Sequence, residues 1–104
     1  MANEDYKLKI STLAIKDLTS ISNYINNELK NNIACIKFLE EFDIKIKERL
    51  LEPLAYPEYM STKKRNNKYY VINVKNFTVF YVVMKDKMII KRVLYSKRNF
   101  SKFI

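Results

Sequence analysis

The spacing of apolar residues changes along the chain, and this change restricts the fold more than any other feature. Before Pro53, apolar side chains recur at steps of three and four, as they do along one face of a helix. After Lys68, β-branched and aromatic residues fill short runs that are typical of strands. We therefore expect an α+β fold in which helices pack on an antiparallel sheet.

Six elements are expected, in the order β-α-α-β-β-β. A short strand over 6–10 comes first, and Thr12 is expected to cap the helix that follows. Asn31 and Asn32 separate the two helices, and so short a connection favours an antiparallel hairpin of helices. The apolar stripes consist of Ala14, Leu18, Ile21, Ile25 and Leu29 in the first helix, and of Ile33, Ile36, Leu39, Phe42, Ile46 and Leu50 in the second. Pro53 is expected to end the second helix.

The remaining elements are three strands, expected over 69–74, 77–84 and 88–95. Lys75-Asn76 suits a tight hairpin turn between the first two of them. A basic tail follows, in which Phe100 and Phe103 can pack back onto the sheet. The sequence leaves open which of these strands pairs with the N-terminal one.

Length and composition exclude several classes of protein. A chain of 104 residues fits one domain, 1–104, and the absence of glycine excludes the glycine-rich phosphate-binding loops. With no His and only Cys35, we expect neither a metal site, nor a Cys–His pair, nor a disulfide within the chain, and we expect Cys35 to be a small buried apolar residue. No small-molecule cofactor is expected. Short apolar runs and an acidic start without a signal peptide predict a cytoplasmic protein with no membrane partner.

Charge is distributed unevenly between the two parts of the chain. Residues 1–60 contain eight Lys and Arg and ten Asp and Glu, whereas 61–104 contain twelve Lys and Arg and the single acid Asp86, a net charge of +11. Such an imbalance favours a polyanion or an acidic protein as partner. The alternative is a lysine-rich surface that is merely solvated.

The order of certain residues over about 6–102 is similar to that of one protein family. They are Ala14-x-x-Asp17-Leu18-x-x-Ile21-x-x-Tyr24-Ile25, Glu28-Leu29-x-Asn31, Ala34, Pro53, Tyr56-Pro57, Tyr70-x-x-x-Val74-x-Asn76-Phe77-x-Val79-Phe80-Tyr81 and Ile90-x-Arg92-Val93-Leu94-Tyr95-x-Lys97-Arg98. In these the chain resembles the RelE/ParE superfamily, the toxins of bacterial type II toxin–antitoxin systems, often called plasmid stabilisation proteins. The last segment is the most specific.

The resemblance implies a small α+β toxin that is inactivated by an antitoxin encoded beside it. Such an antitoxin has a DNA-binding part and an acidic, partly disordered segment that folds onto the toxin. A half-domain with a net charge of +11 suits a segment of this kind. RelE-like members cut mRNA in the ribosomal A site, whereas ParE-like members poison DNA gyrase and need no catalytic residues of their own.

Cleavage of RNA through its own 2′-hydroxyl needs a base, an acid and cations that neutralise the phosphate. Without His, the catalytic candidates are Arg98, Lys97 and Tyr95. The candidates for binding RNA phosphates are Arg65, Lys68, Lys75 and Arg92.

Each of these residues also has a structural interpretation. Tyr95 can be a packing aromatic of an alternating strand, and Arg92 can face a helical acid such as Asp17 or Glu48. The run Lys63-Lys64-Arg65 can be a solvated loop rather than a phosphate contact.

The resemblance to the RelE-like enzymes holds at one of their usual catalytic positions and departs at four. Arg98 falls on a basic position at the end of their last strand. Val71 and Asn73 occupy positions of two lysines, Thr78 that of an arginine, and Ile104 that of an essential tyrosine. We expect a ribosome-dependent mRNA endonuclease. The alternatives are a non-enzymatic inhibitor of DNA gyrase and a weakened relative that only binds the antitoxin.

Overall fold

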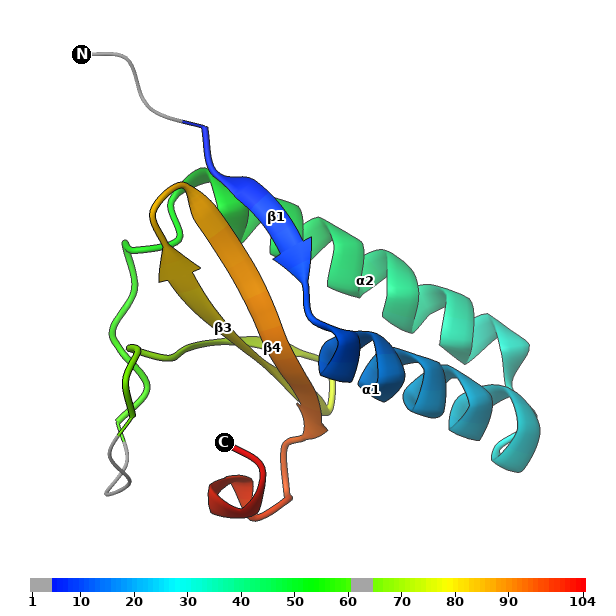
Figure 1. Ribbon diagram of the computed structural model, residues 1–104. Coiled ribbons are helices and arrows are strands. Elements are labelled where there is room, and N and C mark those ends of the chain that lie inside the picture. The colour runs from blue at the N-terminus through cyan, green and yellow to red at the C-terminus, as the bar shows by residue number, and fades with distance from the viewer. Residues whose placement is uncertain (1–4, 61–64) are drawn as a thin grey trace.

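The computed structural model describes residues 5–60 and 65–104 and confirms the expected α+β fold (Figure 1). Its elements are β1 (Lys7–Ile10), α1 (Thr12–Asn23), a π-helical turn η1 (Tyr24–Glu28), α2 (Asn32–Leu51), β2 (Tyr70–Val74), β3 (Phe77–Met84), β4 (Lys87–Tyr95) and a 3₁₀ turn η2 (Phe100–Lys102). The expected order of strands and helices is therefore correct, and the boundaries of the strands differ by one residue at most.

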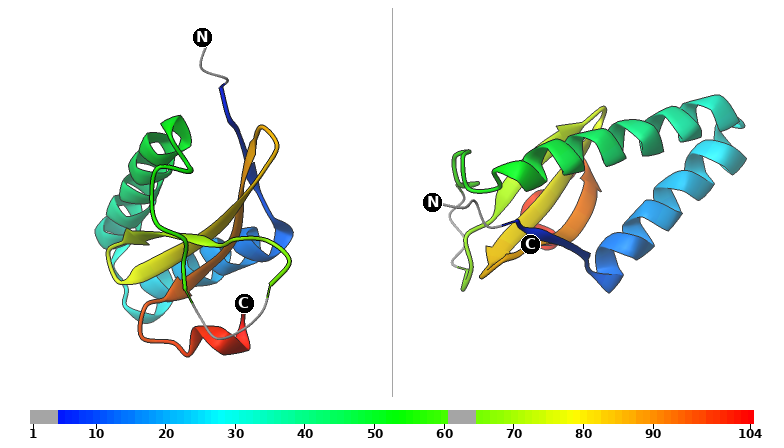
Figure 2. Two further views of the ribbon diagram at one scale, coloured as in Figure 1. Left: turned by 90° about the vertical axis from the view of Figure 1, so that its left-hand side faces the viewer. Right: turned by 90° about the horizontal axis from the view of Figure 1, so that it is seen from above.

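The strands form one sheet in the order β1-β4-β3-β2. As expected, β2, β3 and β4 are antiparallel neighbours. The partner of β1, which the sequence left open, is β4, and the two strands run parallel, with Lys7–Ile10 paired to Lys87–Ile90. The sheet is therefore mixed, and both helices pack on one of its faces (Figure 2).

Both helices begin at polar side chains that bind the free N–H groups of the first turn. Ser11, and not Thr12 as the sequence predicted, caps α1, because its Oγ accepts a hydrogen bond from the Ala14 N–H at 3.1 Å. The same hydroxyl donates to the Lys91 carbonyl at 3.0 Å, which joins the start of α1 to β4. Asn31 caps α2 through the Ala34 N–H at 3.0 Å.

Among the described residues, three lysines adopt the left-handed backbone that glycine usually supplies. Lys30 lies between the helices (φ 50°), and Lys75 (φ 52°) and Lys85 (φ 57°) lie in the two hairpin turns. The turn at Lys75-Asn76 is where the sequence predicted it, but its positive φ falls on the lysine rather than on Asn76. Each left-handed lysine costs roughly 1–2 kcal/mol that glycine would not.

The main core lies between the helices and the sheet. Cys35 is buried in it, as the sequence predicted. Its buried members are Ala14, Ile25, Cys35, Phe38, Phe42, Ile46, Tyr70, Ile72, Val74, Val79, Tyr81, Met88, Ile90 and Val93.

The predicted stripe of α2 is correct in its C-terminal half only. Phe42 and Ile46 are buried, but Ile33, Ile36 and Leu39 are exposed, and Cys35 and Phe38 are buried in their place. In the first stripe, Leu29 is exposed as well. The tip of the helical hairpin extends beyond the sheet (Figure 1). The sheet therefore does not bury the apolar side chains of the tip.

A second apolar cluster covers the opposite face of the sheet. Phe80, Leu94 and Ile104 form its buried centre, and Phe100 and Phe103 pack against it, as the sequence predicted. The Phe100 ring meets that of Phe80 edge-on, with 4.9 Å between centroids. The partly buried apolar residues around this centre are Tyr59, Tyr69, Val71, Phe100 and Phe103.

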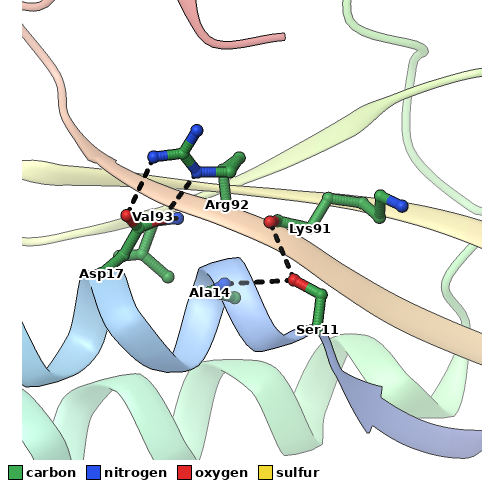
Figure 3. A network of polar contacts seen from close by, with 6 residues as sticks. All are labelled: Ser11, Ala14, Asp17, Lys91, Arg92 and Val93. Carbon is green, nitrogen blue, oxygen red and sulfur yellow. Dashed lines mark hydrogen bonds and ion pairs between the residues drawn. The ribbon is translucent and has the colours of Figure 1, made fainter.

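One carboxylate closes the open edge of β4 beyond the end of β1 (Figure 3). Asp17 on α1 accepts hydrogen bonds from Arg92 Nε at 2.8 Å, from Arg92 Nη2 at 2.9 Å and from the Val93 N–H at 2.9 Å. Because β1 ends at Ile10, no neighbouring strand is available to that N–H. Asp17 thus replaces a strand and fixes α1 to the sheet.

Side chains of α2 close the opposite edge, along β2. Lys45 Nζ donates to the Asn73 carbonyl at 3.1 Å, and Arg49 Nη1 donates to the Val71 carbonyl at 3.0 Å. Arg49 Nη1 also donates to the hydroxyl of Tyr81 at 2.9 Å, and that hydroxyl donates to the Pro53 carbonyl at 2.7 Å. Burial of Tyr81 raises the pKa of its phenol above the ordinary 10.0, although the bond from Arg49 acts in the other direction.

We expect Asp17→Asn to lower the free energy of unfolding by about 2–3 kcal/mol, because it leaves Arg92 without a counter-charge where its side chain is only 17% exposed. Urea denaturation measures the loss. The matched control is Asp43→Asn, which breaks an exposed pair with Lys47 (3.1 Å) and should cost less than about 0.5 kcal/mol. Equal losses in the two variants would contradict the role assigned to Asp17.

Tyr81 should make stability depend on alkaline pH. Above pH 10 the unfolded chain releases the phenolic proton while the folded chain, whose Tyr81 pKa is higher, retains it, so the stability falls as pH rises. Tyr81→Phe lacks this proton, so the stability advantage of the native chain over the variant should narrow between about pH 9 and about pH 11. Denaturation at both values measures it, and an advantage independent of pH would refute the assignment.

Candidate functional site

Four of the seven residues predicted as a site lie at one end of the sheet. Tyr95 ends β4, Lys97 and Arg98 follow in the next turn, and Lys75 lies in the turn between β2 and β3. The backbone joins the two turns, because the Ser96 N–H donates to the Asn76 carbonyl at 2.9 Å. We refer to Lys75, Tyr95, Lys97 and Arg98 as the basic end; all four are exposed.

Within the basic end, Arg98 has a guanidinium that is oriented by an aromatic ring and is available to a ligand. Its guanidinium carbon lies 4.9 Å from the centroid of the Phe103 ring, a cation–π contact that orients the group. Within residues 5–60 and 65–104 it forms no ion pair with a carboxylate. Its N–H groups can therefore meet a ligand.

Tyr95 has a packing role that the sequence also allowed. Its ring contacts that of Phe77 edge-on, with 5.9 Å between centroids. Its side chain is nevertheless exposed, so the basic end combines three cations with one phenol.

Arg92 is bound to a helical acid, one of the two alternatives left open by the sequence. The acid is Asp17 and not Glu48, and the pair raises the pKa of Arg92 through the hydrogen bond to the carboxylate. The guanidinium also lies 5.4 Å from the Phe103 centroid. A phosphate at Arg92 would have to compete with Asp17.

Arg65 and Lys68 precede β2, at the end opposite to Lys75. The five residues of β2 separate the two places by about 16 Å. Arg65 lies over the rings of Tyr59 (5.5 Å) and Tyr69 (5.3 Å), and its Nη2 donates to the Ile104 main-chain oxygen at 3.4 Å. Lys68 and Lys75 therefore lie at different ends of β2, whereas Arg65, Arg92 and Arg98 all contact the tail residues Phe103 or Ile104.

A cavity of about 290 Å³ lies at this second place. It is lined by Glu58, Tyr59, Met60, Arg65, Asn66, Asn67 and Lys68. Lys63 and Lys64, the rest of the predicted basic run, fall outside the described residues.

The four positions that differ from the RelE-like enzymes serve the packing of the sheet or its hydrogen bonds. Val71 and Ile104 belong to the apolar cluster around Phe80. Thr78 is buried, and its hydroxyl lies 2.8 Å from that of Ser96 and 3.4 Å from Asn73 Oδ1. These positions place no cation and no acid or base on this face of the sheet.

A second cavity, of about 280 Å³, contains an arginine that sequence reasoning missed. The guanidinium of Arg49 lies over the Tyr56 ring at 3.6 Å and, in the described part of the chain, forms no ion pair with a carboxylate. An arginine in the last turn of a helix usually interacts with the helix dipole, so its position alone carried no signal. The cavity is lined by Lys45, Glu48, Arg49, Tyr56, Ile72 and Asn73.

Two further searches of the described residues bear on the kind of site. Across 5–60 and 65–104, no three His, Cys, Asp or Glu side chains gather as a metal site would require. Over the same residues, each helix is too short or too polar to cross a membrane.

The fold is similar to that of two solved toxin–antitoxin structures. The chromosomal ParDE system from P. aeruginosa matches with a TM-score of 0.75 and 14% identity, over 91% of this chain and 100% of that chain. The RelB–RelE antitoxin–toxin complex from Methanococcus jannaschii matches with a TM-score of 0.50 and 22% identity, over 92% of this chain and 99% of that chain. Both likenesses support the RelE/ParE-like fold. No curated protein sequence matches significantly.

The sequence itself also matches a family model. The model describes the ParE toxin of the type II toxin–antitoxin system parDE, and its match covers residues 8–100, nearly the whole chain. The chain therefore belongs to the ParE toxin family of type II toxin–antitoxin systems.

Proposed function

We propose that this toxin inhibits growth by binding DNA gyrase without catalysis, and that a cognate antitoxin neutralises it. This is the alternative that the resemblance offered beside mRNA cleavage. The observation that carries the proposal is the chemistry of the sheet face opposite the helices. Where RelE-like enzymes place catalytic cations and a tyrosine, this chain has Val71, Asn73, Thr78 and Ile104.

The packing of that face supports a structural role for those residues. Val71 and Ile104 help to build the cluster around Phe80 and Leu94, which η2 and its neighbours cover. A phosphate bound against Val71 and Ile104 would lose its hydration without gaining a charged partner from these residues, which is costly. Binding through a surface needs no such group.

A second candidate function, ribosome-dependent mRNA cleavage, is supported by one observation. Arg98 offers its guanidinium beside Lys97, and the phenol of Tyr95 lies at the same end of the sheet. Cations and a group that can transfer a proton are among the groups that this reaction needs. In that case the basic end would be the active site, and Arg98 its phosphate-binding catalytic residue.

The surface of the helical hairpin supports the antitoxin as partner. Exposed apolar side chains gather at its tip, where the sheet does not cover them, and apolar patches of this kind mark protein interfaces. They are Tyr24, Leu29, Ile33, Ile36 and Leu39. The net charge of +11 over 61–104 is complementary to an acidic segment. The two similar structures are themselves toxin–antitoxin systems.

The test follows new DNA and new protein by pulse labelling after the toxin is induced in bacteria without its antitoxin. We expect DNA synthesis to fall first. We expect Arg98→Ala, which removes one exposed cation of the basic end, to keep its effect within about twofold of the native toxin, because one rim charge contributes little to a broad interface. Lys47→Ala, which removes an exposed cation from α2, is the matched control.

Three results would contradict the proposal. If protein synthesis falls first and Arg98→Ala reduces toxicity by about 100-fold or more, the chain is a nuclease with a catalytic Arg98. If growth is unaffected at every expression level, the chain is an inactive relative. If the co-expressed antitoxin does not restore growth, the partner assignment is wrong.

A further inference from the structure

We propose that the cavity beside Arg49 binds the carboxylate of an acidic side chain of the protein partner, flanked in that partner by apolar residues. The inference deepens the proposed binding of an antitoxin and rests on it. The cavity is distinct from the candidate nuclease site, because none of the candidate nuclease residues lines it. Lys45, Glu48 and Arg49 of α2 line it along the edge of β2.

The guanidinium of Arg49 is held in one orientation by three contacts. Its Nη1 donates to the Val71 carbonyl and to the Tyr81 hydroxyl, which uses both hydrogens of that nitrogen. Its face lies on the Tyr56 ring at 3.6 Å. A group fixed in this way loses little entropy when a ligand binds.

The remaining donors of Arg49 are open. Within the described residues, Nε and Nη2 have no hydrogen-bond acceptor, and the guanidinium has no carboxylate partner. Arg92 provides the contrast in the same chain, because its Nε and Nη2 bind both oxygens of Asp17. The structure therefore leaves at Arg49 the donors that Arg92 uses for its carboxylate.

The charges around the cavity favour a single carboxylate over a nucleic-acid backbone. Glu48 lines the cavity, and Lys45 is already bound to Glu41 at 3.4 Å and to the Asn73 carbonyl. A chain of phosphates needs a continuous positive surface, which Glu41 and Glu48 interrupt. One carboxylate needs only the fork of one arginine.

The surroundings indicate apolar neighbours for that carboxylate. Of the lining residues, Tyr56 and Ile72 are apolar, and Tyr56 is 51% exposed. Tyr56 touches the guanidinium itself. A partner segment in which an acidic residue stands between leucines would satisfy both the cation and this apolar surface.

The experiment observes the arginine side-chain Nε–H signals of the free toxin by ¹⁵N NMR during titration with a blocked Leu-Glu-Leu peptide. The chain has four arginines, and Arg49→Lys identifies the signal of Arg49. We expect that signal to shift and saturate with Leu-Glu-Leu but not with Leu-Gln-Leu. The signal of Arg92, already bound to Asp17, should not move.

A variant that leaves the contacts of Arg49 intact tests the charge argument. Glu48→Gln removes the negative charge from the cavity lining and should strengthen binding of Leu-Glu-Leu by about two- to fivefold. The matched control, Glu40→Gln, changes an exposed acid of α2 outside the lining and should leave the affinity unchanged.

Several outcomes would overturn the inference. They are an Arg49 signal that does not saturate, equal shifts with both peptides, an unchanged affinity in Glu48→Gln, and tighter binding of inorganic phosphate than of Leu-Glu-Leu, which would indicate a nucleic-acid contact. If the signal stays still while the antitoxin still neutralises the toxin, this inference alone fails. If the antitoxin does not neutralise the toxin, the proposed function fails whatever the peptide does.

Discussion

The carboxylate of Asp17 is the contact on which the arrangement of the two halves depends. It binds the side chain of Arg92 and the main chain of Val93, and so ties α1 to β4. Arg92 in turn lies against the Phe103 ring, on which Arg98 also rests. Asp17 thus stabilises, through one arginine, both the packing of the helices and the position of the tail that covers the opposite face of the sheet.

Side chains from helices or their caps bind the backbone at two stretches of the sheet edge. Ser11 and Asp17 bind the backbone of β4 where β1 has ended, and Lys45 and Arg49 bind the carbonyls of β2. Unpaired edges attract other strands, so covering them protects a small sheet from aggregation. Partners of this protein are therefore expected to meet side-chain surfaces first, because the backbone of these stretches is occupied.

The sequence predicted those features that depend on local periodicity and missed those that depend on how elements meet. Two helices and four strands followed from apolar spacing and from Pro53, and Phe103 was placed on the sheet. The burial of Phe38 rather than Leu39 was missed, because a helix that projects beyond its sheet has a different buried face from one covered along its length. The parallel partner of β1 and the choice of Asp17 over Glu48 required the three-dimensional arrangement.

The arginines differ in their availability to a ligand for a related reason. Arg65, Arg92 and Arg98 look alike in the sequence, but their contacts differ. Arg92 is paired with Asp17, and Arg65 packs on two tyrosines before β2. Arg49, which sequence reasoning passed over, keeps open donors because its hydrogen bonds go to neutral oxygens rather than to a carboxylate. The number of cations therefore says little about where this protein binds a ligand. What decides it is whether each guanidinium already has a counter-charge, and that depends on residues far away in the chain.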